Sequence, residues 1–220
     1  MKKLVILISG QGSNLQALID HCQQGSIPAQ IQAVISDQAA AYGLVRAQQA
    51  GIPSVIIRRS PSLTRVQYDQ LLAETVAAYQ PDLVVLAGFM HILGPNFLQA
   101  FSQQILNIHP SLLPKYPGLN THQQVLANQD TYHGATVHFV TEQLDAGPVI
   151  LQARIAVSPQ ETLDSLRFRI QQQEWVIYPL AVRWFIEGRL VMRHGSAWLD
   201  QQRLPSTGYP FPVDLSLAEN

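Results

Sequence analysis

The stretch Leu4-Val5-Ile6-Leu7-Ile8-Ser9-Gly10-Gln11-Gly12-Ser13-Asn14 decides the fold class of this chain. Its apolar beginning, rich in β-branched residues, is typical of a strand that is buried on both faces of a parallel sheet. The two glycines permit a tight turn, and the apolar spacing that follows predicts a helix. A buried strand joined by a short turn to a helix is the repeating unit of α/β proteins.

The same alternation continues outward through the first two-thirds of the chain. Short apolar runs predict buried strands at Leu4–Ile8, Ile31–Ser36, Ser54–Ile57, Leu83–Gly88 and Ile105–Ile108. Helical spacing predicts helices at Asn14–Gln24, Ala40–Ala50 and Leu63–Tyr79. We therefore predict an α/β fold with a doubly wound, mostly parallel, Rossmann-like sheet.

The pattern changes after this point. Strand-like runs at His133–Glu142 and Pro148–Val157 predict an antiparallel C-terminal addition, followed by a long C-terminal helix from about Glu161 to Glu187. No linker composition divides the chain, so we predict a single domain over 1–220. Within it, residues 1–110 would form a phosphate-binding α/β half, residues 111–204 a second half, and residues 205–220 a loose tail.

Composition excludes several classes of protein. Of the 220 residues 47% are hydrophobic and only 13% charged, and a net charge of -1 leaves no large basic face for nucleic acid. Cys22 is the only cysteine, which excludes an internal disulfide and suits a reducing, cytoplasmic environment. The apolar run Leu83–Met90 is far shorter than the ~20 residues of a membrane-spanning helix. We expect a soluble, cytoplasmic protein without membrane or nucleic-acid partners.

The glycine-rich turn at residues 10–14 is a candidate anion site. Ligands of open parallel sheets bind beyond the carboxyl ends of the strands, and free amides at a helix start attract phosphate. The turn is neither a Walker loop, because no lysine follows, nor a dinucleotide fingerprint, because Leu15 stands at the third glycine position. Ser13 and Asn14 would either bind phosphate oxygens or cap the helix. Asp37, after the second strand, is a weak candidate for a ribose-binding acid.

Asn107 and His109 end the fifth predicted strand and share one of its faces, since side chains two residues apart point the same way. An amide donor beside an imidazole suits acyl transfer to an amine, because the amide stabilises an oxyanion and the imidazole moves protons. A purely structural pair remains the alternative.

Asp145 lies in the turn Leu144-Asp145-Ala146-Gly147-Pro148, where a turn-forming aspartate is the simplest interpretation. If it lies beside His109, its charge would favour the imidazolium form. His133 and His138 are five residues apart on a strand, so they point to opposite faces and cannot share a metal ion there; surface or core roles are expected for both.

Several motifs in this order resemble those of the folate-dependent formyltransferases. They are the turn at 10–15, Ala87-Gly88-Phe89-Met90, Asn107-Ile108-His109-Pro110-Ser111-Leu112-Leu113-Pro114 and the Asp145 turn, and the resemblance extends from about residue 3 to residue 208. Two segments are similar to the forms found in the branch of this family that formylates a ribonucleotide. They are Gly12-Ser13-Asn14-Leu15 and Pro117-Gly118-Leu119-Asn120-Thr121-His122. The resemblance implies 10-formyltetrahydrofolate as donor, the amine of glycinamide ribonucleotide as acceptor, a role in de novo purine biosynthesis, and no metal.

The resemblance also implies roles for individual residues. Catalysis would fall to Asn107, His109 and Asp145. The substrate would be bound by Gly12, Ser13, Asn14 and Glu174. The folate would contact Arg65, Met90, His91, Ile92, Leu93, Asn107, Thr141 and Asp145. Residues 111–204 would be the folate-side half of the domain. The oligomeric state would be a monomer or a homodimer.

Two positions depart from the family pattern: Gln11 replaces an asparagine, and His91 replaces an arginine. If backbone atoms of residues 90–93 recognise folate, the change at His91 alters the affinity for folate little. Alternatives with the same Asn-x-His motif are a hydrolase that releases formate and transferases acting on initiator methionyl-tRNA or a sugar nucleotide. Those relatives carry a further domain, for which this chain has no spare residues. A nicotinamide-dependent Rossmann oxidoreductase and a non-catalytic folate binder are more distant alternatives.

Overall fold

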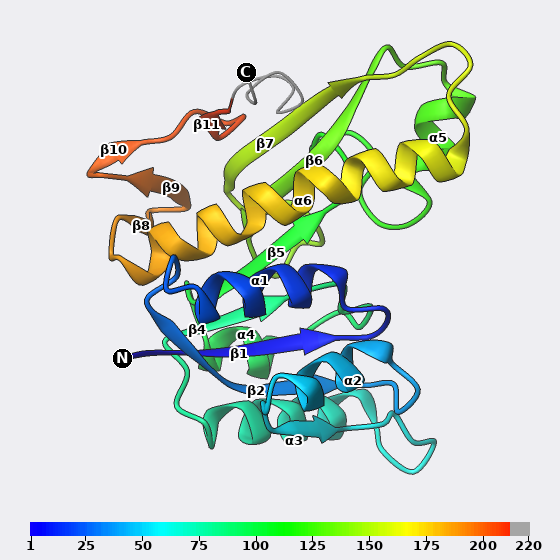
Figure 1. Ribbon diagram of the computed structural model, residues 1–220. Coiled ribbons are helices and arrows are strands. Elements are labelled where there is room, and N and C mark those ends of the chain that lie inside the picture. The colour runs from blue at the N-terminus through cyan, green and yellow to red at the C-terminus, as the bar shows by residue number, and fades with distance from the viewer. Residues whose placement is uncertain (212–220) are drawn as a thin grey trace.

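The computed structural model describes residues 1–211, and residues 212–220 lie outside the described part of the chain. Its main feature is an eight-stranded sheet. In spatial order the strands are β11 (Tyr209–Pro210), β7 (Val149–Ala156), β6 (Tyr132–Phe139), β5 (Ile105–His109), β4 (Leu83–Leu86), β1 (Lys2–Ile8), β2 (Ala29–Ser36) and β3 (Ser54–Ile56). Strands β1 to β5 are parallel, whereas β6 is antiparallel to both β5 and β7. The predicted mostly parallel sheet with an antiparallel addition is confirmed (Figure 1).

Helices cover both faces of this sheet. They are α1 (Ser13–Gln23), α2 (Tyr42–Gln49), α3 (Arg65–Ala77), α4 (Pro95–Ala100), α5 (Thr121–Ala127) and α6 (Leu163–Ile186). Side chains of α1, α2, α5 and α6 belong to one hydrophobic cluster, and those of α3 and α4 belong to the cluster on the other face. Along β1, Leu4 and Ile6 join the first cluster while Val5 and Leu7 join the second, because alternate strand residues point to opposite faces.

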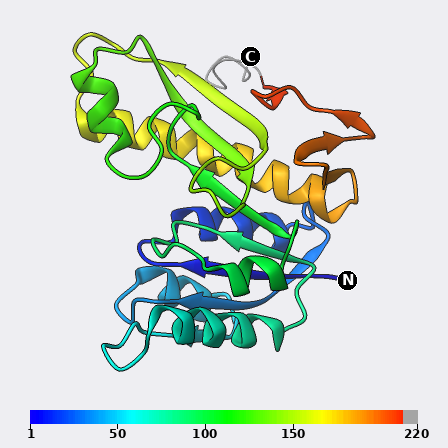
Figure 2. The same cartoon turned by 180° about the vertical axis from the view of Figure 1, so that it is seen from behind.

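Local sequence explains where the longer helices begin. Thr64 and Gln67 form a capping box at the start of α3, in which each side chain accepts from the other residue's backbone N–H. Thr162 caps α6 through its hydroxyl, which accepts from the backbone of Ser165 at 3.2 Å. Helix α6 runs along β6 and β7 on one face of the sheet (Figures 1 and 2).

Some elements differ from the sequence-based expectation. Helices α4 and α5 and a small antiparallel sheet of β8 (Leu190–Arg193), β9 (Ser196–Leu199) and β10 (Gln202–Arg203) had no clear sequence signal. The fourth strand ends at Leu86 rather than at Gly88, whose φ of 77° lies outside strand geometry. None of the helices within residues 1–211 has the length and apolar character needed to cross a membrane.

The beginning of the expected loose tail is ordered against the core. Tyr209 and Pro210 form β11, which pairs with β7 in parallel. The Tyr209 ring also packs against Trp184 of α6, with ring centroids 5.2 Å apart. Tyr209 and Pro210 therefore extend the sheet, because an aromatic contact and backbone pairing together offset the entropy of ordering them. The rest of the expected tail, 212–220, lies outside the described residues.

Candidate active site

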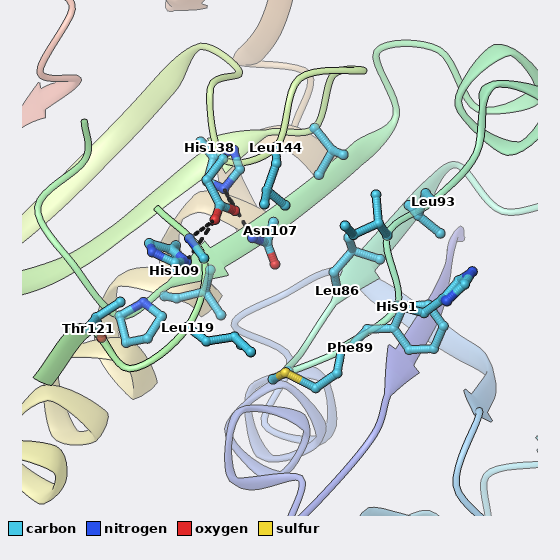
Figure 3. Close-up of a pocket in the computed structure, with 18 of the residues that line it drawn as sticks. Leu86, Phe89, His91, Leu93, Asn107, His109, Leu119, Thr121, His138 and Leu144 are labelled. Carbon is cyan, nitrogen blue, oxygen red and sulfur yellow. Dashed lines mark hydrogen bonds and ion pairs between the residues drawn. The ribbon is translucent and has the colours of Figure 1, made fainter. Parts of the chain in front are cut away.

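A cavity of about 450 Å³ opens at the carboxyl ends of β4 and β5. This is the edge at which ligands of doubly wound sheets bind. Its walls are largely apolar, and Asn107, His109 and His138 gather where β5 and β6 meet (Figure 3). The residues whose side chains or backbone form its functional part include Leu86, Phe89, Met90, His91, Ile92, Leu93, Asn107, His109, His122, His138, Thr141, Leu144 and Asp145. A mostly apolar cavity with a few convergent polar groups is typical of a small-molecule site.

Asn107 is held by a neighbour across the sheet. Strand pairing places it directly opposite His138, and its Nδ2 lies 3.0 Å from His138 Nε2. His138 Nδ1 lies 2.9 Å from the carbonyl of Phe139, which only accepts, so Nδ1 carries the proton. Burial lowers the pKa of His138 and favours its neutral form. Neutral His138 thus accepts one N–H of Asn107, and the second N–H remains for a ligand.

His109 and Asp145 lie together although 36 residues separate them in the chain, as the numbering shows. His109 Nδ1 is 3.4 Å from Asp145 Oδ2, and both side chains are more than nine-tenths buried. On its other side, His109 Nε2 donates to the carbonyl of Tyr116 at 2.8 Å. Both ring nitrogens therefore face oxygen atoms that can accept hydrogen bonds. The closeness that the sequence left conditional is present in the structure.

Asp145 contacts one backbone N–H and lies beside a second histidine. Its Oδ2 accepts from the backbone N–H of Gly118 at 2.8 Å, and its Oδ1 lies 3.8 Å from His138 Nε2. Its φ of 49° is left-handed, a conformation that aspartate tolerates better than most residues. Asp145 therefore joins the 110–120 loop to the two histidines.

The expected folate residues divide into two groups. The cavity is lined by Met90, His91, Ile92, Leu93, Asn107, Thr141 and Asp145. Arg65, by contrast, is exposed at the start of α3 and does not line it. His91, which replaces the family arginine, has its ring edge-on to Tyr68 with centroids 4.7 Å apart. Burial and the nearby Arg59 and Arg65 charges lower the pKa of His91, which favours a neutral ring.

The glycine-rich turn lies next to this cavity. Ser9 connects the two, because its backbone N–H donates to Gly88 and its hydroxyl accepts from the backbone of Met90 at 2.9 Å. Gly12 is left-handed, with a φ of 71°, and a Cβ there would lie 2.7 Å from Gly43 Cα of α2. No side chain caps α1, and its first turn carries no acidic residue. The capping alternative for Ser13 and Asn14 is therefore wrong, and the helix start remains attractive to an anion.

Asn14 instead bonds to the long helix. Its Nδ2 donates to Glu174 Oε2 at 2.8 Å, and both side chains are buried. Burial raises the pKa of Glu174 to about 7, since a charged carboxylate is costly away from water. Asn14 Oδ1 is buried and has no partner within the described residues. Thus Gly12, Ser13, Asn14 and Glu174 form a second polar cluster beside the cavity.

Two functional contacts had only weak sequence signals. His138 was expected to be structural, yet it contacts Asn107 and Asp145. His122 lines the cavity and pairs with His133, with 2.9 Å between His122 Nδ1 and His133 Nε2. The two faces of β6 separate His133 from His138 as predicted, but each finds a partner on another element. The pairing of β6 with β5 and the packing of α5 against β6 bring these partners together.

Comparison with known proteins places the chain in a family. The family model described as formyl transferase matches residues 2–182, a range that includes Asn107, His109, Asp145 and Glu174. The chain belongs to the formyl transferase family.

Among formyl transferases, the chain is 53% identical to phosphoribosylglycinamide formyltransferase of Escherichia coli over 206 residues, which is 94% of this chain and 97% of the relative. The structure of phosphoribosylglycinamide formyltransferase from Coxiella burnetii is similar with a TM-score of 0.92 and 48% identity, covering 96% of this chain and 99% of that one. A formyltetrahydrofolate deformylase from Pseudomonas syringae is similar at 26% identity and a TM-score of 0.82, but the chain covers only 65% of it.

Proposed function

We propose that this chain transfers the formyl group of 10-formyltetrahydrofolate to the amine of glycinamide ribonucleotide, as a phosphoribosylglycinamide formyltransferase of de novo purine biosynthesis. The observation that carries the proposal is the cluster of Asn107, His109 and Asp145 at the cavity, in a chain that is 53% identical to such an enzyme almost end to end. An anion-attracting turn beside an apolar cavity supports one phosphorylated and one largely apolar substrate.

The chemistry follows from the polar base of the cavity. The amine of the ribonucleotide attacks the formyl carbon, and a tetrahedral intermediate with a negative oxygen forms. The free N–H of Asn107 and the cationic His109 stabilise this oxygen, while the carboxylate of Asp145 stabilises the imidazolium. The bond from the formyl carbon to N10 then breaks, N10 takes up a proton, and the amine gives one up, leaving formylglycinamide ribonucleotide and tetrahydrofolate.

Folate would occupy the apolar part of the cavity. Residues Met90, His91, Ile92 and Leu93 line one wall, and Thr141 and Asp145 belong to the opposite loop. These walls suit a flat heteroaromatic ring, since apolar surface provides affinity and a few polar groups provide orientation. Arg65 lies outside the cavity, so its proposed contact would be with the outer, charged end of the folate. Contacts would thus come from both 1–110 and 111–204.

The ribonucleotide phosphate would bind at Gly12, Ser13 and Asn14. The uncapped start of α1 offers backbone N–H groups, and no acidic side chain in its first turn opposes an anion. Glu174, which accepts from Asn14, would contact another polar part of the same substrate. Ser9 ties this turn to the cavity loop, so both substrates would meet at Asn107.

A formate-releasing hydrolase is the second candidate. The similarity to the Pseudomonas syringae deformylase favours it, because the same fold serves both kinds of enzyme. Water would replace the amine as the attacking group, and the same Asn107 and His109 would stabilise the oxyanion. Dependence of turnover on the amine distinguishes the two reactions.

The test is to incubate the protein with 10-formyltetrahydrofolate, with and without glycinamide ribonucleotide, and to follow tetrahydrofolate release. We expect release only with the ribonucleotide, and a loss of about 10²-fold or more in His109→Ala. Release of formate without an amine would favour the hydrolase. Equal turnover by His109→Ala, or nicotinamide binding without folate binding, would contradict the proposal.

A further inference from the structure

Asp69 is a buried carboxylate that the proposed chemistry does not use. It lies on α3, is only 2% exposed, and does not line the cavity. Its Oδ1 accepts from the backbone N–H of Gly94 at 2.6 Å, and its Oδ2 accepts from that of Phe97 at 3.1 Å. Both oxygens are therefore satisfied by the first turn of α4, where a negative charge is most favourable.

Helix α4 has no cap of its own. Gly94 is its N-cap residue and provides no side-chain hydrogen bond, so the Asp69 side chain of α3 caps the helix instead. A Cβ on Gly94 would lie 2.6 Å from the Asp69 carboxyl carbon. The Gly94 backbone, with a φ of -89°, is one that any residue adopts, so glycine is needed here for close approach and not for conformation.

The segment that Asp69 holds directly follows the cavity wall. Residues 90–93 line the cavity and lead directly into Gly94. Tyr68, the neighbour of Asp69, packs edge-on against His91 at 4.7 Å and donates its hydroxyl to the carbonyl of Ile57. Two adjacent residues of α3 therefore contact the middle and the end of this wall. At its other end, the hydroxyl of Ser9 accepts from the backbone of Met90.

We propose that Asp69 is a positioning residue that sets the path of residues 90–93 for folate binding. The inference rests on the proposed function, because it takes folate as the occupant of this cavity. Asp69 touches neither substrate. Asp69 holds the start of α4 in place, which keeps residues 90–93 in their binding conformation. Folate binding then needs little further ordering of this segment, so its free energy of binding is more favourable. The phosphate turn contacts this wall through Ser9 at Met90, at the end away from Gly94, so ribonucleotide binding should change little.

The experiment compares Asp69→Asn with wild type and with Asp82→Asn. Asp82 is a matched control, because it also accepts a backbone N–H, from Lys3 at 2.8 Å, but at the amino end of β1, the end opposite the cavity. Calorimetry would measure tetrahydrofolate binding, and initial rates would give KM for each substrate. We expect Asp69→Asn to weaken tetrahydrofolate binding about tenfold, the scale of one lost charge-assisted hydrogen bond. The KM for the ribonucleotide should stay within about twofold, and Asp82→Asn should change neither constant.

Gly94→Ala provides a second route if Asp69→Asn folds poorly, since it leaves the carboxylate in place and inserts a Cβ against it. It should give the same folate-specific loss, and the double variant should lose little more than either single one. Unchanged tetrahydrofolate binding in a folded variant, or equal losses for both substrates, would overturn the inference. A wild-type protein that binds no tetrahydrofolate would overturn the proposed function, and this inference with it.

Discussion

At the scale of single residues, Asn107 offers the most direct test of the oxyanion role. One of its N–H groups is held by His138, and the other is free to contact the substrate. Asn107→Ala should lower kcat by about 10²- to 10³-fold, the usual cost of removing one oxyanion donor. Tetrahydrofolate binding should change far less, because the donor acts mainly when charge develops. Steady-state rates together with calorimetry check this, and a variant with normal kcat would contradict it.

Glu174 leads to a prediction about stability and pH. Burial raises its pKa to about 7, above its ordinary value of 4.5, so the folded protein binds the proton more tightly than the unfolded chain does. The stabilisation is fully present below pH 4.5 and is lost as pH rises through about 7. Glu174→Gln should remove this fall, because the amide does not ionise. Melting temperatures between pH 5 and pH 8 check it, with the exposed Glu142→Gln as control; an unchanged pH profile in Glu174→Gln would disprove it.

At the scale of elements, the His122–His133 pair joins the start of α5 to β6. The nitrogens lie 2.9 Å apart and the rings are perpendicular, with centroids separated by 5.1 Å. Burial lowers the pKa of His122 to about 4 and that of His133 to about 3. A single proton between two neutral rings makes this bond. Protonation of the accepting nitrogen would charge that ring and set two N–H groups against each other, which breaks the bond.

The docking of α5 should therefore weaken in acid. Both folded pKa values lie below the ordinary value of 6.5, so the contribution is complete above pH 6.5 and declines as pH falls towards 4. Hydrogen exchange of residues 121–127, expressed as protection factors, should show this decline in the wild type. His133→Phe should flatten it, whereas the exposed His194→Asn should leave it unchanged. Protection that stays constant from pH 7 to pH 4 in the wild type would refute the prediction.

At the scale of the whole molecule, Tyr178 connects the long helix to the centre of the sheet. Its buried hydroxyl lies 2.9 Å from the carbonyl oxygens of both Leu86 in β4 and Leu106 in β5. Burial raises the pKa of Tyr178 well above its ordinary value, so the hydroxyl stays protonated and donates. This contact fixes the position of α6, which contains Glu174, relative to β4 and β5, which border the cavity.

Tyr178→Phe should lower the free energy of unfolding by about 1–3 kcal/mol, because two buried carbonyl groups lose a donor. For a chain of this size each kcal/mol corresponds to about 2–4 °C in Tm. Calorimetry measures both quantities. Tyr132→Phe, at an exposed position, is the control and should change Tm little. A Tm for Tyr178→Phe equal to that of wild type would show that the hydroxyl contributes nothing.

The sequence by itself determined the features that depend on neighbouring residues. Apolar runs and turns predicted the parallel strands, and the period of two along a strand placed Asn107 and His109 on one face. Alternation of that kind is local, so no knowledge of the folded chain is needed. The sequence did not reveal α4 or α5, which are short and lack a periodic apolar pattern.

Only the tertiary structure decided which groups meet. Asp145 reaches His109 because β6 and β7 fold back beside β5, and His138 faces Asn107 because β6 pairs with β5 in a particular register. The capping alternative at Asn14 was likewise resolved by a partner 160 residues away, Glu174. Strand order and register minimise the free energy of the whole core, and therefore no short stretch of sequence specifies them.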